Sequence, residues 1–417
     1  MPGWVAVALI VVNLGLIFLL IAAPVGVRTI SRTVCIAAPA GRVWDAVYPL
    51  GNDAGWSGEI LAAEPIADRP ERVRLVVDWE GRDGLPIRRV AELSDVSREL
   101  AFSMRIVEDS SLDAGFWAGF SEQVELEPEE ESVRLTIRQT DSYRGAAFLV
   151  FRYFALRRRM AKLKRWAETG AYRRGGMFEH PLTQVAMAAA SIMILWTLTG
   201  FTVGGLAFAV MLTAVVALHE LGHMAAFRVA GHRRTRMIFI PLLGGIAIGG
   251  RPYDSHFEVA FVALMGAGFS AFLVPPLMQA GAMAVAANNV HGGNFMAALV
   301  GCIALFNLAN LVPVWKFDGG QVLRQICPPG LPLAISSFVL LGQFLAVGWL
   351  AGFPPAVVLT AGGVFAALSL MTSGHTVKPR DALTPIDTGG RIALAAALVA
   401  VIFIHGLGVI WAFTHLG

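Results

Sequence analysis

The chain has 417 residues, of which 56% are hydrophobic and 15% are charged, and its formal net charge is +3. This composition is too apolar for an ordinary soluble enzyme and indicates a polytopic membrane protein. The three cysteines, Cys35, Cys302 and Cys327, form no CxxC pair, which argues against both a disulfide framework and a cysteine zinc site.

An uncharged apolar run at residues 4–24 is long enough to cross a bilayer. No basic residue precedes it, and its positive flank lies downstream, which favours a reverse signal-anchor over a cleaved signal peptide. Residues 1–27 are therefore predicted to form an N-terminal transmembrane anchor.

Residues 28–178 are polar and are predicted to form a cytoplasmic domain. A short helix, "AGRVWDAVYPL", precedes alternating runs such as "ERVRLVVDWEG" that are typical of antiparallel strands, and a long helix is predicted over 146–169. This order, the opening "CIAAPAGRVWDAVYPLGNDAGW" and the closing "RRRMAKLKRWAE" resemble the START/SRPBCC helix-grip class. The resemblance implies an α+β domain whose cavity takes a small hydrophobic ligand. The other interpretation is a regulatory or protein-binding module whose cavity is filled by side chains.

A basic run lies within the predicted long helix. We expect it to contact anionic lipid headgroups rather than nucleic acid, because such runs are common beside membrane segments. Its members are Arg157, Arg158, Arg159, Lys162, Lys164 and Arg165.

Further apolar stretches make about eight predicted transmembrane helices in all. They lie at 182–203, 205–227, 257–283, 295–315, 331–351, 355–373 and 391–412. The sequence therefore predicts a membrane core at 179–330 and C-terminal transmembrane helices at 331–417. Of the 33 basic residues, 23 lie between Arg28 and Arg174. With the N-terminus outside, all 33 fall on the cytoplasmic side, which predicts an integral protein of a cell membrane, of the bacterial inner-membrane kind.

The stretch "MIFIPLLGGIAIGG" at 237–250 is too short to cross and is bracketed by Arg236 and Arg251. It is predicted to be a re-entrant β element that turns at Gly244-Gly245, which requires protein or water to satisfy its backbone. The fold class expected is thus a polytopic α-helical membrane protein with one re-entrant β element and an inserted helix-grip-like domain.

"VVALHELGHMAAF" at 215–227 places His219, Glu220 and His223 inside a predicted membrane helix. Ionisable groups are costly there, so a functional role is the default interpretation. The two histidines, four residues apart, share one helix face, as two ligands of one zinc ion require, and Glu220 can accept a proton from water.

A third zinc ligand is needed, and "NLANLVPVWKFDGG" contains Asn310, Pro313, Asp318 and Gly319 as NxxPxxxxDG. Together with HExxH, this motif resembles the site-2 protease family of intramembrane zinc metalloproteases over residues 182–330. The resemblance implies that His219, His223 and Asp318 bind Zn²⁺ and that Glu220 is the general base. It also implies that Asn310 holds the substrate backbone or the oxyanion, and the alternative for Asn310 is a helix-terminal hydrogen bond. Asp254 and His256 are rival ligands by position only.

The function predicted is hydrolysis of peptide bonds in single-pass membrane proteins near the cytoplasmic face, with possible regulation by a ligand or protein at the 28–178 domain. Two alternatives remain. One is a non-catalytic membrane receptor or lipid-binding protein that acts through the helix-grip domain. The other is a membrane zinc peptidase with a glutamate as third ligand, which the lack of a following ExxxD-type helix disfavours. His405, Gln343 and Asn13 are expected to form interhelical hydrogen bonds.

Overall fold

The chain folds into two compact units, and each is described by itself. The computed structural model describes residues 15, 18–19, 23–51, 56–171, 181–240, 244–314, 316–372 and 379–416. The first unit comprises Met1–Arg174 with His375–Ala382, and the second comprises Gly175–Gly374 with Leu383–Gly417. The helices beyond residue 331 therefore belong to the same unit as the helices that precede them. The predicted anchor and Asn13 lie outside the described residues.

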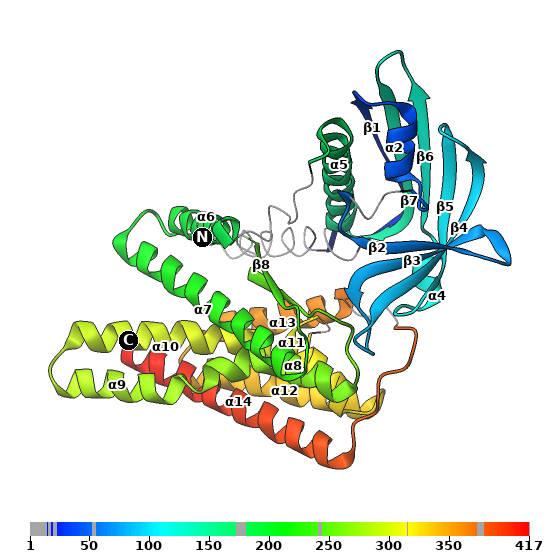
Figure 1. Ribbon diagram of the computed structural model, residues 1–417. Coiled ribbons are helices and arrows are strands. Elements are labelled where there is room, and N and C mark those ends of the chain that lie inside the picture. The colour runs from blue at the N-terminus through cyan, green and yellow to red at the C-terminus, as the bar shows by residue number, and fades with distance from the viewer. Residues whose placement is uncertain are drawn as a thin grey trace. The chain divides into compact units, whose positions relative to one another are not determined.

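The first unit is built on one antiparallel sheet of seven strands in the order β1-β7-β6-β5-β4-β3-β2 (Figure 1). The strands are β1 (Pro24–Ile36), β2 (Ile60–Ile66), β3 (Arg69–Glu80), β4 (Pro86–Ser97), β5 (Ala101–Asp109), β6 (Ser121–Pro128) and β7 (Val133–Arg144). The first and last strands pair with each other, so the two ends of the domain meet at β1 and β7. Alternating buried and exposed residues, as in Val73, Leu75 and Val77, give the sheet one apolar face.

Two helices cover this apolar face, α2 (Ala40–Val47) and α5 (Ala146–Thr169), and a short α4 (Ala114–Trp117) lies between β5 and β6. Leu156, Met160 and Leu163 of α5 pack into the core with strand residues such as Leu135. The arrangement is the helix-grip-like one that the sequence predicts, and the long helix occupies 146–169 as expected. Buried side chains of the sheet and of α5 lie against one another in this core.

A buried ion pair joins α5 to the sheet. Arg159 Nη1 lies 2.8 Å from Oε2 of Glu122, whose side chain is 2% exposed, and Gln139 donates to the same oxygen at 2.6 Å. The expectation that the whole basic run faces lipid headgroups is therefore wrong for Arg159, because the buried carboxylate needs a cationic partner. Lys164 likewise donates to the carbonyl of Cys35 at 2.8 Å.

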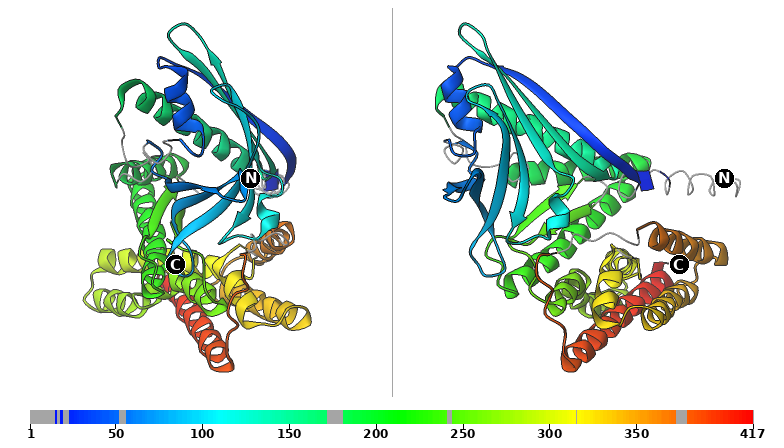
Figure 2. Two further views of the ribbon diagram at one scale, coloured as in Figure 1. Left: turned by 45° about the vertical axis from the view of Figure 1, so that its right-hand side comes forward. Right: turned by 90° about the vertical axis from the view of Figure 1, so that its right-hand side faces the viewer.

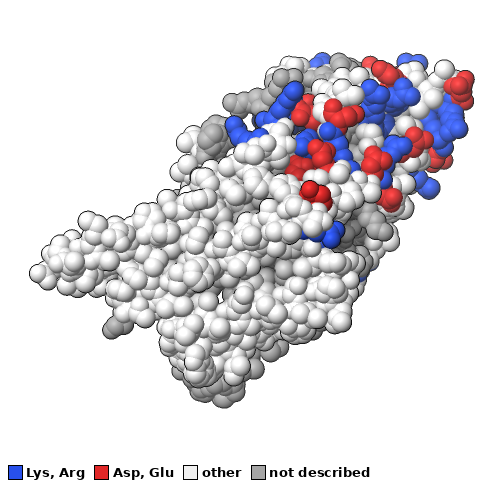
Figure 3. Space-filling model, turned by 90° about the horizontal axis from the view of Figure 1, so that it is seen from below, with Lys and Arg blue, Asp and Glu red and all other residues white. Residues whose placement is uncertain are grey.

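The second unit is helical. Its helices are α6 (Pro181–Leu198), α7 (Val203–Val229), α8 (His256–Ala271), α9 (Val274–Ala286), α10 (Val290–Asn310), α11 (Asp318–Ile326), α12 (Leu331–Leu350), α13 (Pro355–Thr372) and α14 (Thr388–Leu416). Five helices of the described residues are long and apolar enough to cross a membrane, when α8 and α9 are taken together as His256–Ala286. Leu182–Leu198 and Pro355–Ser369 are shorter apolar helices. A broad face of the protein carries no charged side chain, which suits contact with lipid (Figure 3).

The predicted span 257–283 is interrupted. α8 ends at Ala271 and α9 begins at Val274, where Pro275 and Pro276 occupy the first turn. Proline lacks an N–H and restricts the residue before it, so it starts a helix readily and breaks one that continues through it. The expected interhelical role of His405 is confirmed, since its buried Nε2 lies 3.0 Å from the carbonyl oxygen of Ala267 in α8.

The stretch predicted to be a β element forms an antiparallel hairpin of β8 (Arg236–Ile240) and β9 (Gly244–Ile248). The turn expected at Gly244-Gly245 is wrong, because both glycines pair within β9, opposite Ile240 and Phe239. The glycine at 245 serves close packing instead. A Cβ there would lie 2.3 Å from Cγ of Glu220 on α7.

Candidate metal centre

Three potential ligand atoms converge where α7 meets the start of α11. His219 and His223 lie one turn apart on α7, and Asp318 is the first residue of α11. The two histidine Nε2 atoms are 3.1 Å apart, and Asp318 Oδ2 lies 3.1 Å from Nε2 of His219 and 3.5 Å from Nε2 of His223. Donor atoms about 2.0 Å from a tetrahedral metal are separated by roughly 3.3 Å, so these spacings fit one metal ion.

The hydrogen bonds behind the two imidazoles fix their tautomers. His223 Nδ1 lies 2.7 Å from the carbonyl oxygen of Val262, which can only accept, so Nδ1 of His223 carries the proton. His219 Nδ1 lies 2.8 Å from Oδ1 of Asn307, whose amide nitrogen donates to the carbonyl of Ile303 at 2.8 Å. Both Nε2 atoms therefore present lone pairs to the centre, as metal-bound histidines do.

The charge balance of the cluster also suits a cation. Asp318 Oδ2 is buried and has no hydrogen-bond donor among the described residues. Two imidazole lone pairs and this carboxylate oxygen face one another, and such buried acceptors are costly unless a donor or a metal ion lies between them. The cluster is thus a site whose donor set and spacing fit a divalent metal ion.

Glycines make room for this cluster. A Cβ at Gly266 of α8 would lie 2.5 Å from Nε2 of His223 and 2.7 Å from Cε1 of His219. A Cβ at Gly222 would lie 2.3 Å from the carbonyl oxygen of Met265, so α7 and α8 pack closely at this level. Any residue other than glycine at position 266 would displace the two imidazole rings.

Glu220 lies in the same cavity as the three ligands, which has a volume of about 280 Å³. Its side chain packs against β9, where the backbone of Ala247 hydrogen-bonds to its carboxylate. Asn310, Tyr253 and Gln321 also line this cavity. A carboxylate thus shares one small space with the three potential ligands, without belonging to their cluster.

Of the two roles considered for Asn310, its hydrogen bond is the helix-terminal one. Its amide nitrogen donates to the carbonyl of Phe306 at 3.0 Å, at the last turn of α10, although the residue also lines the cavity. The residue that contacts a ligand directly is Asn307, which was not singled out from the sequence. The sequence did contain a clue to Asn307, because a lone amide in a predicted membrane helix is expected to have a polar partner.

The rival ligands lie outside the cluster. Asp254 pairs with Arg251 at 2.7 Å and has a side chain 45% exposed, whereas His256 bonds to Gln325 of α11. Nearby, His232 Nε2 lies 2.6 Å from Oε1 of Glu258, and Arg251 Nη2 lies 3.3 Å from the same oxygen. This buried network joins the loop after α7 to the first turn of α8, and so supports the helices that carry the ligands and their partners.

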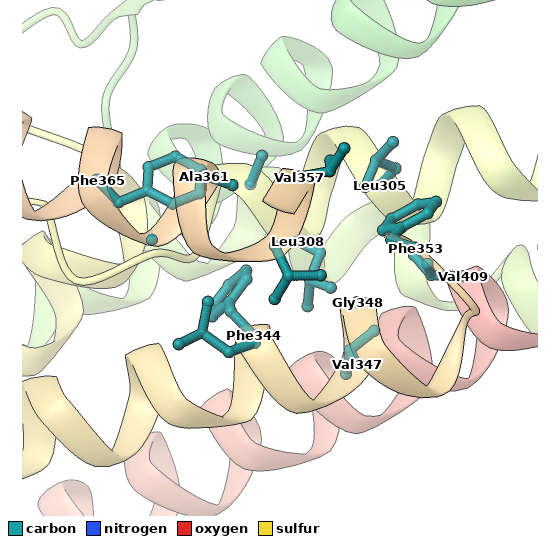
Figure 4. A pocket seen from close by; sticks show the side chains of 14 residues that line it. Leu305, Leu308, Phe344, Val347, Gly348, Phe353, Val357, Ala361, Phe365 and Val409 are labelled. Carbon is teal, nitrogen blue, oxygen red and sulfur yellow. The ribbon is translucent and has the colours of Figure 1, made fainter. Parts of the chain in front are cut away.

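A second cavity, of about 310 Å³, is apolar and is lined by residues of α10, α12, α13 and α14. Leu305 and Leu308 of α10 face it, opposite Phe344 and Val357 (Figure 4). The residues that line it include no ionisable side chain.

No protein-family model matches the sequence, and no curated protein matches it. Solved structures similar to the chain include a START superfamily protein from Mycobacterium smegmatis, at 16% identity and a TM-score of 0.28, covering 34% of this chain and 99% of that one. A protein from Deinococcus radiodurans matches at 18% identity and 0.26, over 34% and 100%. The Aha1 dimer from Colwellia psychrerythraea matches at 13% and 0.27, over 34% and 98%.

Proposed function

We propose that the protein is an intramembrane zinc metalloendopeptidase, in which His219, His223 and Asp318 hold Zn²⁺ and Glu220 is the general base. The observation that carries the proposal is the convergence of two imidazole lone pairs and an orphaned carboxylate oxygen beside a second carboxylate in one cavity. A structural role would not need all four groups within an apolar helix bundle.

Zinc bound at these residues would act as a Lewis acid toward water and the substrate carbonyl. The residues of this chain then supply the proton transfers. Glu220 accepts a proton from the attacking water as the new C–O bond forms, and it returns that proton to the amide nitrogen as the C–N bond breaks. Water and peptide yield one carboxylic acid and one amine, with the Glu220 carboxylate regenerated. The fixed Nδ1–H bonds of both histidines keep their Nε2 atoms in place throughout.

The outer edge of β9 suggests how an extended substrate would be held. Phe239 N–H bonds to the side chain of Gln184 rather than across the hairpin, so Phe239 and its partner Gly245 form a pair that is not hydrogen-bonded. By alternation, Gly245 and Ala247 direct their backbone groups to the outer edge of β9, on the side of Glu220, where a substrate strand would replace the contact between Ala247 and the Glu220 carboxylate. A locally unwound substrate could add to this edge as a strand beside the cavity.

The substrate class proposed is a single-pass membrane protein cut near the cytoplasmic face, because the distribution of basic residues favours a cytoplasmic side for this end of the bundle. The first unit would then be a cytoplasmic module of a protein in a bacterial inner membrane. The packed interface of α5 with the sheet favours a regulatory or protein-binding role for this module over an open ligand cavity.

The test is accumulation of uncleaved membrane proteins. Glu220→Gln removes the base but keeps the shape of the side chain, so cleavage should fall by about 10²–10⁴-fold while zinc is retained. Quantitative proteomics of membranes from cells that carry Glu220→Gln should reveal full-length substrates that co-purify with the variant. Glu130→Gln, the same change in an exposed turn, is the matched control. If the two variants give the same membrane proteome and the same cleavage, the alternative of a non-catalytic receptor or lipid-binding protein acting through the helix-grip domain would replace this proposal.

A further inference from the structure

The first half of α5 differs sharply from the second half. Its large apolar side chains point away from the domain core: Phe148 is 55% exposed, Phe151 62% and Phe154 48%. From Leu156 onward the helix instead buries a regular apolar stripe against the sheet. Exposed aromatic residues clustered on one helix segment mark an interaction surface, whereas single exposed residues do not.

A hollow lies beside this segment of α5. It has a volume of about 610 Å³ and lies between residues 28–31 of β1 and the first turns of α5, where Leu149, Val150 and Tyr153 line it. β1 and α5 lie side by side in the first unit (Figure 2). We call the exposed residues Phe148, Val150, Phe151 and Phe154 the aromatic face.

The position of this face in the chain indicates its partner. Gly145, which precedes α5, donates its N–H to the carbonyl of Ala23 at 2.8 Å, and Arg144 pairs with Pro24. Ala23 ends the uncharged apolar run that begins at residue 4. By sequence, the apolar run at residues 4–24 is long enough to span a bilayer, so we expect α5 to begin beside the point where the chain leaves the membrane. The rise of a helix places Phe154 only about 12 Å further along the axis from Ala146.

The charges around the aromatic face agree with a lipid partner. Arg28, Arg144 and Arg157 are exposed at its margins. Phenylalanines on one face of a surface helix bury at the boundary of headgroups and acyl chains, and arginines beside them meet the phosphates of anionic lipids. We infer that the aromatic face of α5 inserts into the interfacial layer of the cytoplasmic leaflet and fixes the domain against the membrane. This surface is independent of the metal centre and of any peptidase activity.

The experiment uses the full-length protein in nanodiscs that contain anionic phospholipid. The native cysteines are replaced (Cys35→Ser, Cys302→Ala, Cys327→Ala), and a nitroxide is attached at Phe151→Cys. Collision rates with oxygen, which concentrates in lipid, and with a water-soluble nickel chelate then report the surroundings of the label. Glu130→Cys in an exposed turn is the aqueous control, and Val399→Cys, on α14 and 58% exposed, is the lipid control.

We expect the ratio of oxygen to nickel collisions at Phe151→Cys to exceed that at Glu130→Cys several-fold and to approach that at Val399→Cys. The ratio should fall when the anionic lipid is replaced by a zwitterionic one, since the arginines then lose their partners. A ratio equal to that of Glu130→Cys would overturn the inference. A label shielded from both reagents would overturn it too, because it would show that protein covers the face. The Phe151 side chain is largely exposed, so its replacement leaves the core intact.

Discussion

Oδ1 of Asn307 lies 2.8 Å from Nδ1 of His219, although the two residues are 88 positions apart in the chain. Asn307 is fully buried, and its amide nitrogen is held by the carbonyl of Ile303 in its own helix, which turns its oxygen toward the histidine. A residue of α10 thus decides which nitrogen of a histidine on α7 is free to bind a metal ion. Such outer partners are part of a metal site as much as the ligands are.

Asn307→Ala should lower the zinc affinity by about 10–100-fold, because His219 loses the acceptor that fixes its ring and tautomer. Competition with a chromophoric chelator measures this affinity in purified protein. Asn310→Ala, one turn further along the same helix, is the control and should bind zinc like the unchanged protein. Equal affinity in Asn307→Ala and the unchanged protein would remove Asn307 from the metal centre.

His223→Ala and Asp318→Asn should each lose most bound zinc, since the site has three protein ligands and Asp318 supplies its negative charge. Asp254→Asn should keep it, because the carboxylate of Asp254 pairs with Arg251 outside the cluster. Elemental analysis of the purified variants gives the metal content per chain. A full complement of zinc in Asp318→Asn would refute the ligand assignment.

Gly245→Ala should reduce cleavage by about 100-fold while zinc stays bound. The added methyl would lie 2.3 Å from Cγ of Glu220, so either the carboxylate or β9 must move, and displacements of about 1 Å in an active site have effects of this size. Gly342→Ala on α12, where a Cβ meets nothing within 4 Å, is the matched control. The assay is cleavage of a substrate found with Glu220→Gln, and normal turnover by Gly245→Ala would show that the contact is unimportant.

Tyr143→Phe should raise the stability of the first unit. The Tyr143 hydroxyl is buried without a hydrogen-bond partner among the described residues, which costs about 1–3 kcal/mol. Burial also raises the pKa of this phenol above 10.0. The folded state therefore keeps this proton to higher pH than the unfolded state, so the contribution of Tyr143 to stability is constant well below pH 10.0 and declines as the pH rises above it. Thermal unfolding followed against pH should show a smaller alkaline decline in Tyr143→Phe than in the control Tyr153→Phe, and the same decline in both would contradict the assignment.

The first unit should be cytoplasmic. In a Cys35→Ser background, a membrane-impermeant thiol reagent should label Glu130→Cys only after the cells are permeabilised, because the other orientation would export most of the basic residues. His291→Cys, in the first turn of α10 and on the predicted outer side, should be labelled in intact cells. The reverse pattern would invert the topology and place the metal centre at the opposite face.

Local sequence signals predict some features of this fold well. The helix at 146–169, the strands of the first unit and the one-face spacing of His219 and His223 all follow from short-range periodicity. Features that depend on packing between distant segments do not follow from local sequence patterns. Gly245 was expected in a turn because glycine is common there, but its neighbour is Glu220, which no local pattern reveals. Asn307 likewise gained its role only when α10 packed beside α7.

Gly319 closely approaches the end of α10, which explains why Asp318 and Gly319 must follow α10 at a fixed number of residues. A Cβ at Gly319 would lie 1.8 Å from the carbonyl oxygen of Leu311, so the chain folds back on the end of α10 and brings Asp318 to the histidines. During synthesis, a chain that has emerged only as far as α9 already carries HELGH but has neither Asn307 nor Asp318. Such a nascent chain would be unable to hydrolyse anything. In the proposed peptidase, the order of the segments along the chain would thus delay activity in the membrane until most of the surrounding helix bundle has been made.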